Sequence, residues 1–184
     1  MAAVEGIHQI TTGQLVSLSE LQLLDCTTYR NHGCRSGVRN SAFQYIVDNG
    51  GITTEDAYPY VMAQGTCNSD GTQTAATISG YQNVPANDED ALAAAVANQP
   101  VSVGIDGQHP VFKMYSGGIM TGDACGTELT HAVTVVGYGV EQDGTSYWLL
   151  KNSWGETWGE GGYMKLERGT GACGVAMQPS YPLA

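Results

Sequence analysis

Basic residues are scarce in this sequence, and it has no long hydrophobic run. Only seven of the 184 residues are Lys or Arg, against 18 Asp or Glu, which gives a formal net charge of −11. This acidic excess argues against nucleic acid and membrane surfaces as partners, because both carry negative charge. No apolar stretch approaches the length of a membrane span. No basic start followed by an apolar segment marks a signal peptide.

Closely spaced cysteine pairs are also absent. The five cysteines are far apart: Cys26, Cys34, Cys67, Cys125 and Cys173. The Cys-x-x-Cys spacing of a zinc site does not occur, and no spacing supports a site built from His8, His32, His109 and Cys34. We therefore expect neither a metal nor another cofactor. Wide spacing in a chain with 25 glycines favours disulfides and an oxidising compartment, and an odd count leaves one cysteine without an internal partner.

The first half of the chain has helical patterns. Helices are predicted over residues 5–12, ended by Gly13, over 20–26 with Ser19 as N-cap, and over 88–98 with Asn87 as N-cap. A further helix, stopped by residues 49–51, is indicated by apolar residues on one helical face: Val38, Ala42, Phe43, Ile46 and Val47.

After Pro100 the pattern changes to short β-branched or aromatic runs between Gly-rich turns. Strands are predicted over residues 101–105, 132–138, 147–151 and 162–167. The sequence therefore indicates an α+β protein. The border lies near residues 80–83, so a mostly helical lobe spans 1–82 and a mostly β lobe spans 83–184. Clefts between lobes are common binding sites.

Two segments of the second half carry residues suited to catalysis. One is Thr130-His131-Ala132-Val133, and the other is Lys151-Asn152-Ser153-Trp154-Gly155. A nucleophilic site needs a base and a group that orients the base, and His and Asn can fill these two roles. Taken alone, a histidine before an apolar strand is most often structural, an Asn is often a turn residue, and a Trp is most often core. Their occurrence together favours a site.

The order of motifs along the chain resembles the papain family of cysteine endopeptidases, closest to its plant members. The matching motifs are Glu5-Gly6-Ile7, Leu18-Ser19-Glu20, Leu24-Asp25-Cys26, His32-Gly33-Cys34, Tyr58-Pro59-Tyr60, residues 98–103, His131, Asn152-Ser153-Trp154-Gly155 and Ser180-Tyr181-Pro182. The resemblance runs from end to end. It implies a papain-like two-lobe fold, with a helical left lobe and a β-barrel-like right lobe.

The resemblance also implies roles for four residues of the second half. His131 would be the imidazole that pairs with a thiolate and supplies a proton to the leaving amine. Asn152 would accept a hydrogen bond from the other ring nitrogen. Trp154 would cover that bond and keep water from it. Trp158 would lie along the primed side of the cleft.

The thiolate itself is not among the residues that match. The family's Cys-Gly-Ser-Cys-Trp segment does not occur, and its catalytic Cys precedes the His by about 130–150 residues. Counting back from His131 reaches Met1 or beyond. We therefore expect an N-terminally truncated chain that lacks the nucleophile and the oxyanion-hole Gln, and is inactive by itself.

The family pattern assigns each cysteine a partner. It pairs Cys26 with Cys67 and Cys125 with Cys173, and it leaves Cys34 without its partner. Two other readings of Cys34 are a buried free thiol and an intermolecular disulfide. Replacement of the nucleophile by Cys34 is not expected, because the family uses that position for a structural disulfide.

The resemblance further implies a substrate site and a setting. The residues that would bind a peptide are Ser36, Gly37, Arg39, Gly104, Leu129, Ala132 and Gln178. Arg39 stands where many relatives have an apolar residue, so it would accept an acidic or polar side chain or point to solvent. Partners would be peptide or protein substrates and cystatin-like or propeptide inhibitors, and the parent protein would be secreted, vacuolar or in a lysosome-like acidic compartment. Two alternatives are a non-catalytic remnant that binds peptides or inhibitors, and a structural or storage protein.

Overall fold

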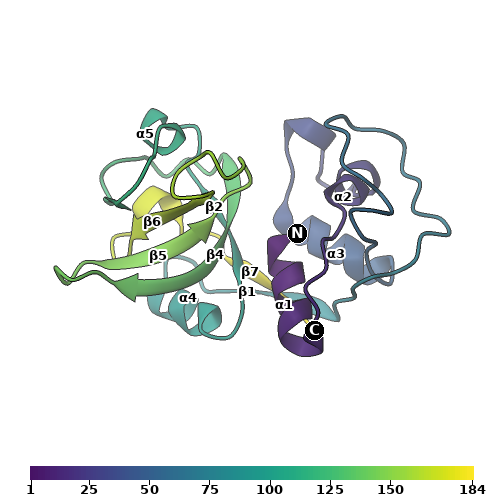
Figure 1. Cartoon of the computed structure of the whole chain (residues 1–184), viewed down its shortest axis with the longest axis horizontal. Coiled ribbons are helices and arrows are strands. Elements are labelled where there is room, and N and C mark those ends of the chain that lie inside the picture. The colour runs from purple at the N-terminus through teal and green to yellow at the C-terminus, as the bar shows by residue number, and fades with distance from the viewer. The chain divides into compact units, whose positions relative to one another are not determined.

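The structure, a computed structural model, describes all residues from 1 to 184, and it divides the chain into two compact units. The first unit comprises Met1–Gln82 together with Pro182–Ala184, and the second comprises Asn83–Tyr181. Figure 1 labels the elements of both units. No helix is both long and apolar enough to cross a bilayer.

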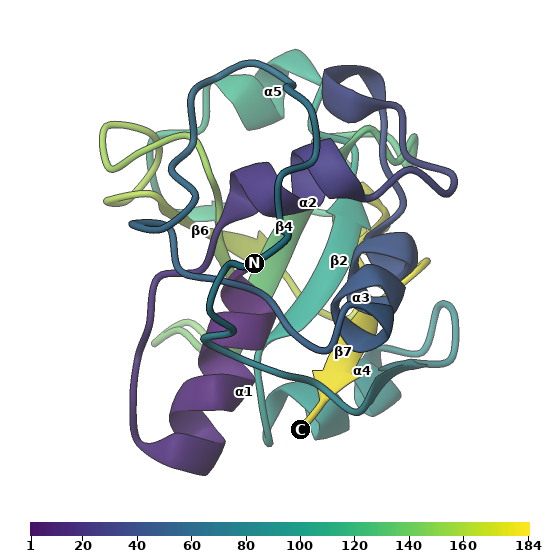
Figure 2. The same ribbon diagram turned by 90° about the vertical axis from the view of Figure 1, so that its right-hand side faces the viewer.

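The first unit contains three α-helices and little strand (Figure 2). They are α1 (Ala2–Thr12), α2 (Glu20–Cys26) and α3 (Arg39–Asp48), with a 3-10 turn at Gly33–Arg35. Gly13 adopts a left-handed conformation with φ 77° and caps α1, and Ser19 Oγ accepts a hydrogen bond from the N–H of Gln22 at the start of α2. Both ends agree with the sequence prediction.

One prediction for the third helix is wrong. Val38 precedes α3 as its N-cap and is 39 % exposed, whereas Phe43 and Ile46 are buried as expected.

The core of the first unit is formed around Val4, Leu18 and Ile52. Gln22 lies inside it, where its side chain donates to Tyr45 Oη and accepts from the N–H of Thr53. These two hydrogen bonds join α2 to α3 and to residue 53, and they satisfy both polar atoms of the buried amide.

The second unit carries most of a seven-stranded sheet whose strand order is β1-β7-β2-β4-β5-β6-β3. The strands are β1 (Gly80–Asn83), β2 (Val101–Ile105), β3 (Ile119–Met120), β4 (His131–Val140), β5 (Ser146–Lys151), β6 (Tyr163–Glu167) and β7 (Ser180–Leu183). The β2–β4, β4–β5 and β5–β6 pairs are antiparallel, and β3–β6 is parallel. The four strands predicted from sequence are present, with β4 longer by one residue at its start, which includes His131, and by two at its end.

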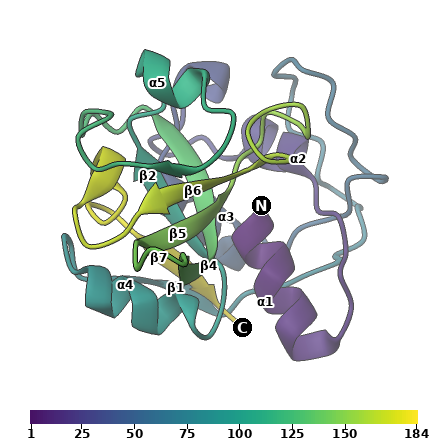
Figure 3. The same ribbon diagram turned by 60° about the vertical axis from the view of Figure 1, so that its left-hand side comes forward.

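Two helices accompany these strands, as Figures 1 and 3 show: α4 (Glu89–Val96), which packs against β2 and β4, and α5 (Pro110–Lys113). The N-cap of α4 is Asp88, whose carboxylate accepts from the N–H of Ala91, and not Asn87, as the sequence suggested. Asn87 has φ 59° and precedes the cap. Both residue types favour the cap position, so local sequence did not separate them. Trp148 is fully buried in the core of this unit, with its indole N–H bonded to Glu89.

Candidate active site

His131 and Asn152 meet at the ends of neighbouring strands. His131 is the first residue of β4, and Asn152 directly follows β5. The strands are antiparallel, with Thr134 opposite Lys151, so the start of one lies beside the end of the other. As a result, His131 Nε2 is 2.8 Å from Asn152 Oδ1.

A second hydrogen bond fixes the direction of this contact. The backbone N–H of Ser153 also donates to Asn152 Oδ1, at 2.8 Å. An amide nitrogen does not accept such a bond, so the atom facing His131 is the oxygen. His131 Nε2 must then carry the proton, and in the neutral ring the lone pair is on Nδ1. An imidazole held in this tautomer can take a proton at Nδ1 and return it.

The buried amide of Asn152 has an unmet donor. The residue is only 8 % exposed, and its Nδ2 has no hydrogen-bond partner. A buried donor without an acceptor costs about 1–3 kcal/mol. Asn152 therefore contributes less to stability than a fully bonded residue would. Its position is better explained by the orientation that it imposes on His131.

Trp154 covers the imidazole. The two rings are stacked, with centroids 4.9 Å apart and planes at 29°. Trp158 meets Trp154 edge to face at 5.5 Å. Trp154 remains 38 % exposed, so part of its surface faces solvent while its ring is stacked on the imidazole.

Phe112 lies at the centre of this aromatic group, and the sequence analysis missed it. It is 0 % exposed, and its ring centroid is 6.0 Å from that of His131, 5.3 Å from Trp154 and 5.1 Å from Trp158. Pro110 at the first helical position is a sequence signal for the short α5 helix that carries it. No sequence signal indicated that this helix would bring a ring to His131.

Gly107 is a second missed residue. A Cβ at this position would lie 2.3 Å from His131 Cβ and 2.9 Å from its Cγ. Real side chains do not approach so closely, so only glycine permits the observed contact. Gly107 follows β2, whose last residue, Ile105, is paired with His131. The backbone after β2 therefore packs directly against the imidazole.

The residues expected to bind substrate fall in both units. In the second unit, Gly104 and Ala132 are opposite each other on β2 and β4, and Leu129 packs close to Gly174. Gln178 is exposed. In the first unit, Ser36 and Gly37 are exposed in the loop before α3, and Arg39 is partly buried at the start of that helix. Burial lowers the pKa of the Arg39 guanidinium from its usual range.

The cysteines pair as the resemblance implies. Cys26 is bonded to Cys67 in the first unit and Cys125 to Cys173 in the second. Cys34 is free and exposed, so the idea of a buried thiol is wrong. No group of three or more His, Cys, Asp or Glu residues is placed to hold a metal ion.

A cavity of about 530 Å³ lies at the start of α4, and none of the residues discussed above as catalytic lines it. Glu89 is its most constrained acidic group. The Glu89 carboxylate accepts from the indole N–H of Trp148 and from the N–H groups of Gly169 and Gly171. These three bonds give Glu89 a structural role.

Comparison with known proteins gives a consistent result. The sequence pattern of the "Papain family cysteine protease" group matches residues 1–183. Cysteine endopeptidase Rep1 of Oryza sativa subsp. japonica is 56 % identical over 189 residues, which is 100 % of this chain and 51 % of the relative. Cysteine proteinase EP-B 1 of Hordeum vulgare is 53 % identical over 191 residues, with coverage of 100 % and 51 %. The chain thus spans about half the length of these curated relatives.

Solved structures agree with the fold. The bromelain protease of Ananas comosus, in complex with the E64 inhibitor, superposes with a TM-score of 0.93 at 42 % identity, over 99 % of this chain and 86 % of that one. The proform of the ragweed pollen allergen Amb a 11, a cysteine protease, gives 0.94 at 49 % identity, over 99 % and 57 %. The α+β fold is therefore papain-like, and the chain belongs to the papain family of cysteine proteases.

Proposed function

We propose that this chain carries the histidine and asparagine of a papain-type peptidase site. In this proposal, His131 Nδ1 accepts the proton of a cysteine thiol, and the resulting imidazolium stabilises the thiolate. The thiolate attacks the peptide carbonyl, and His131 then gives its proton to the leaving amine. The observation that carries the proposal is the hydrogen bond from His131 Nε2 to Asn152 Oδ1, with Ser153 N–H on the same oxygen.

We propose that the thiol must come from outside these 184 residues. Four of the five cysteines are in disulfides, and Cys34 corresponds by resemblance to a disulfide position. The oxyanion donors are also not among the residues identified here, and loss of one such donor costs about 100- to 1000-fold in rate. The 184 residues alone are therefore expected to bind substrate without cleaving it.

The test is hydrolysis of a fluorogenic dipeptide at mildly acidic pH with reductant, with mass spectrometry after exposure to an epoxide inhibitor of cysteine proteases. We expect neither turnover nor adduct. Turnover with an adduct on Cys34 would overturn the assignment of the nucleophile. In a second arm, the chain is fused to a segment carrying the Cys-Gly-Ser-Cys-Trp sequence. Activity should then appear and should be lost in His131→Ala.

A second candidate function is peptide or inhibitor binding without catalysis, which is favoured because the one free cysteine, Cys34, corresponds by resemblance to a disulfide position. Its substrate-facing residues would be those expected from the resemblance, with Arg39 preferring an acidic side chain. Binding of Asp- and Gln-containing versions of one peptide tests this preference. Arg39→Gln should remove the difference between them, and an unchanged difference would exclude Arg39 as its source.

The two disulfides fit synthesis in an oxidising compartment. We propose secretion or a vacuolar or lysosome-like location for the whole protein. Propeptide or cystatin-like inhibitors remain proposed partners. Among the similar structures, Amb a 11 was solved as its proform and bromelain in complex with the E64 inhibitor.

A further inference from the structure

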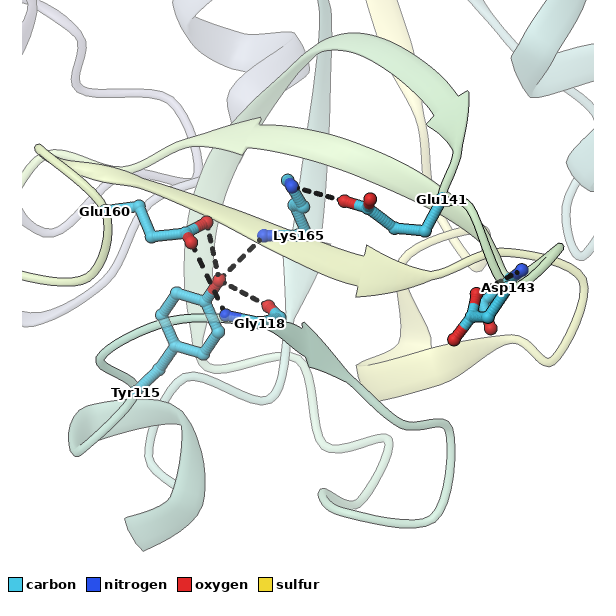
Figure 4. Close-up of polar contacts among 7 residues, drawn as sticks. Tyr115, Gly118, Glu141, Asp143, Glu160 and Lys165 are labelled. Carbon is cyan, nitrogen blue, oxygen red and sulfur yellow. Dashed lines mark hydrogen bonds and ion pairs between the residues drawn. The ribbon is translucent and has the colours of Figure 1, made fainter.

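The Tyr115 hydroxyl joins three separate segments of the second unit. Its single proton is shared between the carbonyl oxygen of Gly118, at 2.6 Å, and Glu160 Oε2, at 3.2 Å, and its oxygen accepts from the N–H of Lys165 at 3.1 Å. Figure 4 shows these contacts converging on the one oxygen atom. The other carboxylate oxygen, Glu160 Oε1, accepts from the N–H of Gly118 at 3.4 Å. The loop after α5 is thus tied to the loop before β6.

The hydroxyl is held in its neutral form. Tyr115 is 8 % exposed, and burial is the main cause that raises the pKa of its hydroxyl. The hydrogen bond from the Lys165 N–H lowers this pKa, and the nearby negative charge of Glu160 raises it. A neutral hydroxyl can donate and accept at the same time. Removal of the oxygen would therefore take one hydrogen-bond partner from each of three segments, at the Gly118 carbonyl, the Glu160 carboxylate and the Lys165 N–H.

The ring of Tyr115 continues this connection toward the histidine. Its centroid is 5.6 Å from that of Trp158, whose indole N–H donates to the carbonyl oxygen of Lys113 at 3.2 Å. Trp158 contacts Trp154, which is stacked on His131. An unbroken series of ring contacts therefore links the Tyr115 hydroxyl to the imidazole.

Glu160 is held close to the same series by the turn that precedes it. Gly159 has φ 58°, and a Cβ there would lie 2.5 Å from the carbonyl oxygen of Tyr163 and 3.1 Å from Tyr115 Cδ1. The turn between Trp158 and Glu160 is therefore packed against the tyrosine ring with no spare room. Movement of Glu160 would move Trp158 with it.

We propose that Tyr115 and Glu160 are positioning residues for His131, acting through Trp158 and Trp154. They hold the two indoles in the arrangement that covers the His131–Asn152 hydrogen bond. Catalytic groups depend on such support, because a displacement of about 1 Å can cost roughly 100-fold in rate. This inference rests on the proposed function of His131.

The side chain of Lys165 offers a matched control. Lys165 touches the cluster with its backbone N–H, whereas its side chain forms an ion pair with Glu141 on the other side, as Figure 4 also shows. Glu141→Gln weakens that exposed pair and leaves the Tyr115 hydroxyl untouched. Glu160→Gln keeps an acceptor oxygen, whereas Glu160→Ala removes it.

The experiment measures, by NMR on the 184-residue chain, the solvent-exchange rate of the His131 Nε2 proton and the chemical shifts of the ring nitrogens. Tyr115→Phe and Glu160→Ala should each speed the exchange about fivefold, the factor that one net hydrogen bond gives. The same two variants should change the chemical shift of His131 Nε2. In Glu160→Gln and Glu141→Gln, the exchange rate of the His131 Nε2 proton should stay close to that of the parent chain.

Unchanged exchange and chemical shifts of His131 in Tyr115→Phe, together with a lower melting temperature, would overturn the proposal in favour of a purely structural role. An equal response of Glu141→Gln would also overturn it. If Tyr115→Phe does not fold, the Glu160→Ala and Glu160→Gln pair decides the matter. Fast exchange in the parent chain would instead refute the His131–Asn152 pairing, and with it the proposed function.

Discussion

Replacement of Gly107 by alanine is the most direct test of how His131 is held. The added methyl group would lie 2.3 Å from His131 Cβ, whereas ordinary contact begins at 3.4 Å. The two groups must therefore separate by about 1 Å. Rotation of the imidazole gives no relief, because its Cβ is fixed to the backbone.

The backbone on either side is constrained by β-sheet pairing. Ile105 is paired with His131, and the N–H of Thr130 donates to the carbonyl oxygen of Ile105 at 3.0 Å. Separation by 1 Å must strain this end of the β2–β4 pair. Overpacking of this kind costs about 1–3 kcal/mol. In a domain of about 100 residues, each kcal/mol lowers Tm by about 4–8 °C.

The assay is thermal unfolding together with NMR of the His131 ring. We expect Gly107→Ala to lower Tm by about 4 °C or more and to weaken the His131–Asn152 hydrogen bond. Gly137→Ala is the control, because it lies on β4 with no atom within 4 Å of its added Cβ. It should change stability by less than about 0.5 kcal/mol. If Gly107→Ala matched Gly137→Ala in Tm and left the His131 signals unchanged, the steric reasoning would be refuted.

Three further predictions concern other parts of the molecule. Trp154→Ala should expose the His131 hydrogen bond and speed exchange of the ring proton, with little loss of stability because the indole is partly exposed; slow exchange in this variant would show that Trp154 does not exclude water. The pKa of Tyr115 is raised in the folded state, mainly by burial. The contribution of the neutral hydroxyl to the free energy of unfolding is therefore complete below the unfolded-state pKa of about 10, and it is lost as pH rises above that pKa toward the folded-state pKa. Denaturant unfolding at several alkaline pH values should show that the free energy of unfolding falls less with pH in Tyr115→Phe than in the parent. An equal fall with pH in both proteins would contradict this. Cys67→Ser removes the disulfide between Cys26 and Cys67, which lie 41 residues apart in the sequence. Loss of this crosslink should lower the free energy of unfolding by about 4 kcal/mol, because the unfolded chain gains loop entropy. A change below about 1 kcal/mol would argue against that explanation.

Local signals in the sequence predicted most element boundaries. Gly13 ends α1 because only a residue tolerant of positive φ suits that cap, and Ser19 starts α2 because its hydroxyl reaches the N–H of Gln22. The failures have equally local causes. Asn87 and Asp88 are both good caps, and the choice between them depended on which one reached the N–H of Ala91. Val38 has the spacing of a helix face but precedes the first turn.

The sequence by itself determined the family, the strand pattern of the second half, and the identity of the His131–Asn152 pair. It did so because motif order and side-chain period are properties of the linear chain. Only the tertiary structure decided what holds that pair. Phe112 and Gly107 lie against His131, and Tyr115 contacts Trp158 of the same aromatic group, through strand pairing and ring packing between residues 19 to 43 positions apart, and no local pattern encodes contacts of that range.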